Sequence, residues 1–340
     1  FQNLQRNKRS ITINLKNSDG KDVFLKLAAK ADVIVENFRP DVKERLGIEY
    51  GKLKAVNQGI ILGSISGFGQ DGPYKDYPAF DDIIQAYSGI AAVNGIQTGR
   101  PELVPMVVCD TMTGQALGQA LLAGLLSRQL QGKGVCIEVP MYELAVSALM
   151  NQHLSGKGFV PAEGPLGYNR VMNPSRRPCR TKDGFMVHGV YKAENWRKLC
   201  KAVGREDLIA SGIMENRQTV MANISTLYKI MLEEIMPQRT NAEWARLFGE
   251  LDIPCGAVQE IDSLMDDEHL AAVGLFEEYE HPTEGHVRQI RQPINVTGLE
   301  RRGDRPPPTL GQDTECVLSE LYGDESCVRQ LINDGIAITN

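Results

Sequence analysis

The sequence lacks the patterns that mark membrane spans, metal sites and disulfide frameworks. No apolar run reaches the length of a membrane span, and the polar, basic start through Lys16 contains no apolar segment of a signal peptide. Its 7 cysteines are odd in number and form no CxxC pair, and its 5 histidines show no HExxH spacing. These absences predict a cytoplasmic protein with reduced thiols, no membrane contact and no bound metal.

Two catalytic signatures and a basic face are also missing. No GxSxG elbow occurs, and the glycine-rich loop at 67–77 does not follow the strand–helix pattern of a dinucleotide site. The net charge of −6 argues against a nucleic-acid partner, because a nucleic-acid binder carries a basic face. A local cluster of Lys and Arg could still bind an anionic ligand.

Short apolar runs alternate with helical stretches over the first 154 residues. Their order predicts an α/β class with a parallel sheet and crossover helices. After residue 155, hairpin signals and amphipathic helices predict a smaller α+β domain, and the tail is predicted to carry a helix within 315–338. Strands are predicted at 10–15, 32–36, 59–66, 103–109 and 135–139, and helices at 111–130, 194–203, 218–236 and 241–249.

Asp110 lies between a predicted strand and the longest predicted helix. At the carboxyl end of a sheet strand it would face the crevice where α/β proteins bind ligands. It could then act as a nucleophile, with the backbone N–H groups of Thr111–Thr113 stabilising an oxyanion. The sequence D-T-M-T is equally a good N-cap before a helix. The pattern leaves both interpretations open.

Basic and aromatic residues after a buried strand indicate a possible anion site. Phe38 could stack on an adenine-type base, and Arg39 or Arg45 could contact phosphates. The alternative is a turn followed by a solvated helix face. Arg176 and Arg177 pose a similar choice, because they could pair with the distal carboxylate of a dicarboxylic acid or simply be solvated.

Nine blocks of the sequence, in order, resemble the class III CoA-transferases, the CaiB/BaiF family that includes formyl-CoA transferase and carnitine CoA-transferase. The blocks are NKRSITINLK, ADVIVENFRP, RLGIEY, SISGFGQDGPY, FDDIIQAYSG, CDTMTGQALGQALLAGLL, QGKGVCIEVPMYE, DIPCGAVQEI and PPPTLGQDT. The resemblance implies a Rossmann-like large domain from both chain ends, 1–154 and 296–340, and a small domain at 155–295. It also implies an interlocked homodimer with linkers at 155–178 and 296–308.

The resemblance further implies a mechanism and a ligand site. Asp110 would attack an acyl-CoA thioester, form a mixed anhydride and then an enzyme–CoA thioester, and pass CoA to a second carboxylic acid. Coenzyme A and acyl-CoA would be substrates, with no tightly bound cofactor. By matching to the family, Ile13, Lys16, Asn37, Phe38 and Arg45 would lie along the CoA site.

Departures from the family pattern keep other functions open. The family's N-terminal strand, Gly-Pro turn and helix are expected to be missing before Phe1, which motivates the hypothesis of an inactive CoA-binding or scaffold protein. The glycine-rich small-domain loop of formyl-CoA transferases has no counterpart, which argues against formate or oxalate. The other alternative, an α-methylacyl-CoA racemase, would lack one of its two bases, because Phe80 stands where that family has a histidine.

Overall fold

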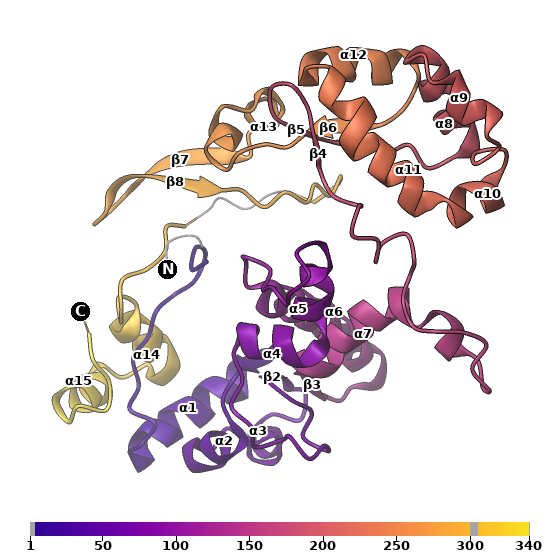
Figure 1. Cartoon of the computed structure of the whole chain (residues 1–340). Helices are drawn as coiled ribbons and strands as arrows, with labels where there is room; N and C mark the ends of the chain where they lie inside the picture. The colour runs from indigo at the N-terminus through magenta and orange to yellow at the C-terminus, as the bar shows by residue number, and fades with distance from the viewer. Residues whose placement is uncertain (1–3, 300–304, 340) are drawn as a thin grey trace. The chain divides into compact units, whose positions relative to one another are not determined.

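The computed structural model of the chain describes residues 4–299 and 305–339. The chain divides into two compact units (Figure 1). The predicted linker 296–308 lies partly outside the described residues. No described helix is long and apolar enough to cross a membrane. The first unit comprises Phe1–Pro78, Thr111–Met141 and Ile261–Asn340, and the second comprises Ala79–Asp110 and Tyr142–Glu260.

A three-stranded parallel sheet forms the centre of the first unit. Its strands lie in the order β1-β2-β3, and β2 is buried along most of its length, as expected for a parallel strand covered on both faces. The predicted α/β class with a parallel sheet is confirmed. The strands are β1 (Val33–Glu36), β2 (Ile61–Ser66) and β3 (Cys136–Pro140), and the helices around them are α1 (Ser18–Lys30), α2 (Pro40–Leu46), α3 (Tyr50–Val56) and α6 (Val108–Gln131).

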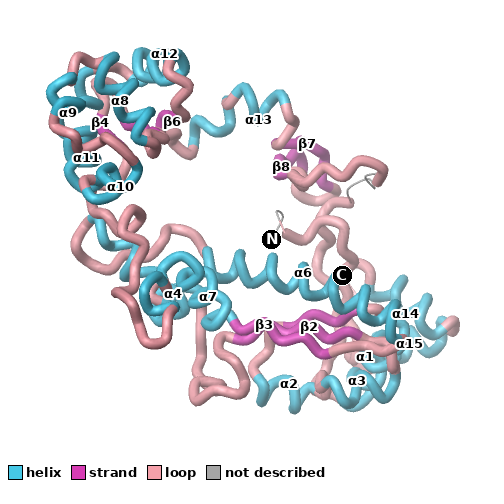
Figure 2. Tube along the Cα trace, turned by 90° about the vertical axis from the view of Figure 1, so that its right-hand side faces the viewer, coloured by secondary structure: helices cyan, strands magenta, loops and turns pink. Residues whose placement is uncertain are grey.

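Helices cover both faces of this sheet (Figure 2). On one face α6 lies so close that a Cβ added to Gly63 of β2 would come within 2.9 Å of Leu121. On the other face, Ala28 of α1 and Leu53 of α3 pack with Leu62 of β2. Small residues in β2 therefore set how closely α6 approaches the sheet.

The two ends of the chain pack together in the first unit. The predicted strand at 10–15 is wrong, since this segment forms only a single bridge, between Ile13 and Ala337. Several of its other hydrogen bonds also go to the C-terminal segment instead of the sheet, with Ser10 N–H donating to the Asp313 carboxylate at 2.8 Å. The segment therefore lacks the continuous ladder of a strand.

The C-terminal part contains the hairpin that its turn signal predicted, and two helices where one was predicted within 315–338. The two tail helices close a small core around Val23, where Leu318 is fully buried. The elements are η5 (Asp262–Asp266), α13 (Glu268–Ala272), β7 (Phe276–His281), β8 (Gly285–Ile290), α14 (Thr314–Tyr322) and α15 (Glu325–Asn333).

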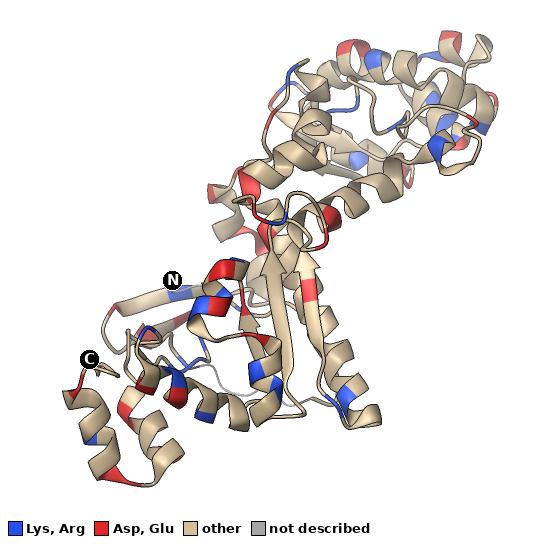
Figure 3. Cartoon of the chain, turned by 90° about the horizontal axis from the view of Figure 1, so that it is seen from below, with Lys and Arg blue, Asp and Glu red and all other residues tan. Residues whose placement is uncertain are grey.

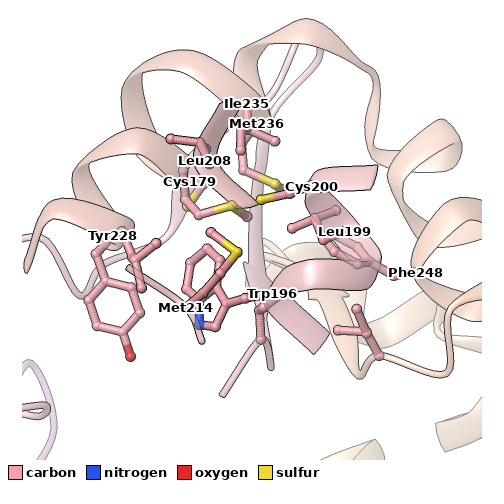
Figure 4. Close-up of a cluster of buried hydrophobic side chains, with 14 of the residues drawn as sticks. Cys179, Trp196, Leu199, Cys200, Leu208, Met214, Tyr228, Ile235, Met236 and Phe248 are labelled. Carbon is pink, nitrogen blue, oxygen red and sulfur yellow. The ribbon is translucent and has the colours of Figure 1, made fainter. Parts of the chain in front are cut away.

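The second unit combines a small antiparallel sheet, in the order β4-β5-β6, with short helices. Its core contains Trp196, Trp244 and Phe248, all at most 1% exposed, and Figure 4 shows part of this cluster. The elements are α4 (Asp81–Ser88), α5 (Ile90–Asn94), η1 (Gly95–Gln97), α7 (Met141–His153), η2 (Ser155–Gly158), β4 (Cys179–Arg180), β5 (Phe185–His188), α8 (Ala193–Ala202), α9 (Glu206–Ala210), α10 (Arg217–Ala222), α11 (Ile224–Ile230), η3 (Met231–Ile235), η4 (Met236–Gln238), α12 (Asn241–Glu250) and β6 (Cys255–Ala257).

One predicted element of the second unit is wrong, and another is interrupted. The predicted strand at 103–109 is irregular up to Val107, and its last two residues begin α6. Pro105 lacks an N–H donor, and the Gln85 side chain takes the place of a neighbouring strand by accepting from the Val104 N–H at 2.8 Å. The predicted helix at 218–236 is broken near Asn223, whose side chain donates to Thr219 O at 2.8 Å. Local side-chain bonds override the periodic pattern at both places.

Acidic and basic residues are interspersed along the helices of each unit (Figure 3). The predicted domain bounds, 1–154 with 296–340 and 155–295, stay a prediction. The two units are defined by contacts within one chain, whereas two interlocked chains would also make contacts between copies. The interlocked homodimer likewise stays a prediction.

Leu318 provides a test of how the tail stabilises the first unit. Leu318→Ala should lower the free energy of unfolding by about 2–5 kcal/mol, because the side chain is completely buried among α1 and tail residues. Chemical denaturation followed by circular dichroism measures the change. Leu310→Ala, at a leucine that is 73% exposed, is the matched control and should change it by less than about 0.5 kcal/mol. Equal losses in the two variants would contradict this account of the tail.

Candidate active site

Asp110 lies in the first turn of α6, and its side chain is exposed. The helix begins at Val108, whereas an N-cap at Asp110 would require it to begin three residues later, at Thr111, so the interpretation of Asp110 as the N-cap is wrong. Because the helix starts early, fewer of the backbone N–H groups predicted for the oxyanion site remain available. Only the first four N–H groups of a helix lack a partner within it, so those of Met112 and Thr113 do not fit that role.

The buried carboxylate of Asp81 holds the start of α6. Its Oδ2 accepts a hydrogen bond from the Asp110 backbone N–H at 2.9 Å, and its Oδ1 accepts one from Gln85 Nε2 at 2.6 Å. Asp81 is 4% exposed and Gln85 is fully buried, so water cannot easily replace either group. Asp81 therefore fixes the backbone that carries the Asp110 side chain.

Gln85 extends the same network to the segment before α6. Its Oε1 accepts from the Val104 N–H, and its Nε2 lies 3.3 Å from Met106 O and 3.4 Å from Val104 O. One turn of α4 thus orders the irregular segment and the first turn of α6 together. Neither Asp81 nor Gln85 was predicted as a site residue, although the sequence has an acidic pair directly after Phe80.

Burial and the neighbouring charge of Asp81 raise the pKa of Asp110. A carboxylate with a raised pKa is a more basic and more nucleophilic group once ionised. The neighbouring Cys109 cannot compete as a nucleophile at neutral pH, because burial, Asp81 and Asp110 raise the pKa of its thiol to about 11. The electrostatics of this turn thus favour Asp110 as its nucleophile.

The residues predicted to bind CoA lie in the first unit. Asn37 and Phe38 directly follow β1, and both are exposed. Lys21 Nζ of α1 donates to Arg45 O at 2.8 Å, which brings the beginning of α1, close after the exposed Lys16, to the end of α2. Four of the five predicted residues thus lie on the surface around α1, β1 and α2, and their role in binding CoA stays a prediction.

Ile13 differs from the other four. It is only partly exposed and packs against the core around Val23 and Leu318. Its side chain also lines an apolar hollow with Ile11, Leu15 and Phe24. A direct contact with CoA stays a prediction for Ile13, and its packing shows a structural role.

Glu36, at the end of β1, is a buried carboxylate that the sequence analysis missed. It accepts hydrogen bonds from Phe38 N–H at 2.7 Å and from the hydroxyl of Ser64, the residue of β2 that pairs with it. Lys43 Nζ lies 3.2 Å from it and supplies the balancing charge. Glu36 thus holds the loop that carries Asn37 and Phe38. The signal was an acidic residue that ends an otherwise apolar strand.

The glycine-rich loop at 67–77 is anchored by an aromatic cluster. Phe68 is 2% exposed, and its ring lies 5.5 Å from that of Tyr74 and 6.2 Å from that of Tyr77. Glu138 of β3 accepts from the Gln70 N–H at 3.2 Å. These contacts hold the loop against the first unit.

The position that bears on racemase chemistry holds an exposed phenylalanine. Phe80 precedes α4 directly and is 80% exposed. A phenyl ring cannot transfer a proton, so this position supplies no second base beside Asp110. Among the described residues, no group of three or more His, Cys, Asp or Glu side chains could hold a metal ion.

Comparisons with known proteins agree with this geometry. Residues 1–314 match the family model described as CoA-transferase family III. The chain is 28% identical over 340 residues to the human succinyl-CoA:glutarate CoA-transferase, covering 99% of this chain and 77% of that protein. It is 28% identical over 345 residues to the formyl-CoA:oxalate CoA-transferase of Rhodopseudomonas palustris (strain BisA53), covering 95% and 80%. A crystal structure of Rv3272 from Mycobacterium tuberculosis superposes with a TM-score of 0.79 at 27% identity, covering 92% and 84%.

Replacing Asp81 tests the electrostatic part of the site. Asp81→Asn should lower the pKa of Asp110, because it removes the nearby negative charge while the asparagine oxygen can still accept the Asp110 N–H. The pKa should remain above its ordinary value, since burial is the larger cause. Carboxyl-carbon NMR titration of labelled Asp110, assigned with Asp110→Asn, measures the shift. A titration that is unchanged by Asp81→Asn would contradict the assigned coupling.

Proposed function

Because the chain belongs to CoA-transferase family III, we propose that it moves coenzyme A from an acyl-CoA thioester to a carboxylic acid, with Asp110 as the covalent nucleophile. The single observation that carries the proposal is the position of Asp110. Its carboxylate is exposed in the first turn of α6, while the backbone beneath it is fixed by the buried Asp81. A fixed, accessible and unusually basic carboxylate suits attack on a thioester carbonyl.

The first half of the proposed reaction loads CoA onto the enzyme. An oxygen of Asp110 attacks the thioester carbon, the C–S bond breaks, and the CoA thiolate leaves a mixed anhydride behind. The thiolate then attacks the aspartyl carbonyl of that anhydride. The donor leaves as a free carboxylate, and Asp110 carries CoA as a thioester. The raised pKa of Asp110 supports this role, since it indicates a more basic oxygen.

The second half reverses these steps on the acceptor. The acceptor carboxylate attacks the aspartyl thioester and displaces the CoA thiolate, which forms a second anhydride. The thiolate attacks the acceptor's carbonyl, so the new acyl-CoA forms and the Asp110 carboxylate returns. No water and no redox equivalent is consumed, and no tightly bound cofactor is needed.

The substrate class we propose is a short dicarboxylic acid as acceptor or donor. The human relative is named for succinyl-CoA and glutarate, and the bacterial one for formyl-CoA and oxalate. We place the CoA nucleotide at Asn37, Phe38, Lys16 and Arg45. An aromatic face and two exposed cations around α1, β1 and α2 suit a base and its phosphates.

Asp110→Asn tests the nucleophile. The amide cannot form the anhydride, so CoA transfer from succinyl-CoA to glutarate should fall by on the order of 10³-fold or more. Mass spectrometry of the product thioesters measures the rate. Asp82→Asn, at an exposed aspartate beside Asp81, is the control and should retain activity. Full activity in Asp110→Asn would overturn the role, and exchange of the α-proton with deuterated water without any acceptor acid would instead favour the racemase.

Glu36→Gln tests the proposed CoA site. The substitution removes the charge that pairs with Lys43 and weakens the hold on Phe38, so the KM for acyl-CoA should rise several-fold while kcat changes little. Steady-state kinetics at saturating acid separates the two parameters. Glu44→Gln, at an exposed glutamate of α2, is the matched control. A several-fold fall in kcat with an unchanged KM for acyl-CoA would contradict a CoA site at this loop.

A further inference from the structure

A cavity of about 230 Å³ lies within the second unit. It is bounded by the loop before β4, by β5 and by α11, and its lining carries two arginines but no aspartate or glutamate. The lining residues are Gln97, Ser175, Arg176, Arg177, Pro178, Cys179, Val187, His188, Tyr191 and Tyr228.

The cations around this cavity lack anionic partners among the described residues. Arg176 and Arg177 form no ion pair there, and neither does Arg170. Arg170 Nε donates to the Tyr168 hydroxyl at 3.0 Å, and its guanidinium lies 4.8 Å from the ring centre of Tyr191. The Nη1 of Arg170 is buried without a hydrogen-bond acceptor. The Arg170 side chain also interacts with the hydroxyl of Tyr228, which does line the cavity.

The positive charge of Arg176 acts electrostatically on the phenol of Tyr228, which lines the same cavity. Tyr228 is 5% exposed, and burial raises its pKa, while Arg170 and Arg176 act in the opposite direction. The hydroxyl therefore stays protonated at neutral pH and can donate to an anion. Cations and a phenolic donor converge here as they do in carboxylate-binding sites.

The loop that presents the arginines is held in place before any ligand binds. Gln97 Nε2 donates to Arg176 O at 2.6 Å, and the buried Asn173 accepts from Ser175 N–H at 2.8 Å and from Arg176 N–H at 3.0 Å. A fixed backbone reduces the entropy that a ligand must offset on binding.

The rest of the lining is apolar or uncharged. Pro178 and Val187 are hydrocarbon, and burial lowers the pKa of His188 to about 4, so that ring is neutral at pH 7. Burial raises the pKa of the Cys179 thiol to about 11, so it carries no charge either. The cavity is below the roughly 300–1,000 Å³ of drug-sized sites. It therefore suits a short aliphatic chain with an anionic end, and not the CoA nucleotide.

We propose that this cavity binds a short aliphatic carboxylic acid, with Arg176 and Arg177 as its charge partners and the Tyr228 hydroxyl as a third donor. Methylene groups of the acid lie along Val187 and Pro178. The assignment of this acid as the partner in CoA exchange rests on the proposed function, whereas its binding does not.

Direct binding of glutarate to the full chain tests the proposal. Isothermal titration at constant ionic strength, without CoA, should show saturable binding to the unmodified protein. The Arg176→Gln/Arg177→Gln variant should bind about tenfold more weakly or worse, because both charged donors are lost. Arg217→Gln, at an exposed arginine of α10 without an ion pair among the described residues, should bind normally.

Two further measurements keep the outcome decisive. An Arg176→Lys/Arg177→Lys variant, which keeps the charges, should recover part of the affinity and guards against a folding defect in the glutamine variant. Equal glutarate affinity in the unmodified and glutamine proteins would overturn the proposal. Sulfate binding as tightly as glutarate would also overturn it, since the apolar wall would then have no part.

The cavity and the proposed function can fail separately. Arginine-dependent glutarate binding without any CoA transfer would support the cavity and overturn the transferase mechanism. CoA transfer to glutarate with an unchanged KM in the Arg176→Gln/Arg177→Gln variant would support the mechanism and overturn the cavity.

Discussion

The hydrogen bond from the Asp110 N–H to the Asp81 carboxylate is the constraint on which the proposed chemistry depends. A covalent nucleophile must be accessible, yet the backbone that carries it must not move. Burying Asp81 and Gln85 satisfies both requirements, because the rigid part lies inside and only the Asp110 side chain reaches solvent. The same proximity places two carboxylates together and makes Asp110 a stronger base.

In the first unit the buried carboxylate of Glu36 also holds a backbone segment, but its charge has a different effect. Glu36 holds the Phe38 backbone as Asp81 holds that of Asp110, but Glu36 is paired with Lys43. The described partners of Asp81 are the N–H groups of Asp110 and Gln85, which leave its negative charge to act on the neighbouring Asp110 carboxylate. The charge of Glu36, which holds a loop, is balanced by Lys43. The charge of Asp81 is not balanced in this way among the described residues, and it makes Asp110 more basic.

Much of the fold could be predicted from the sequence, because short apolar runs between helical stretches leave few alternatives to a parallel sheet. Asp110 could be found because it follows an apolar run and opens a long helix. Asp81 and Glu36 could not be assigned, since their roles depend on contacts with residues 29 and 28 positions away in the chain. The segment 103–109 was predicted as a strand because its pattern is strand-like, and only the structure shows the Gln85 side chain replacing a partner strand.

The most direct test of the central claim is to trap the acylated enzyme. The full chain is mixed with succinyl-CoA, quenched with hydroxylamine, digested and mapped by peptide mass spectrometry. The account predicts a hydroxamate on Asp110 that depends on the thioester and disappears when succinyl-CoA is replaced by free succinate and CoA under the same conditions. An unmodified Asp110 in an enzyme that still transfers CoA, or a label on another residue, would contradict it.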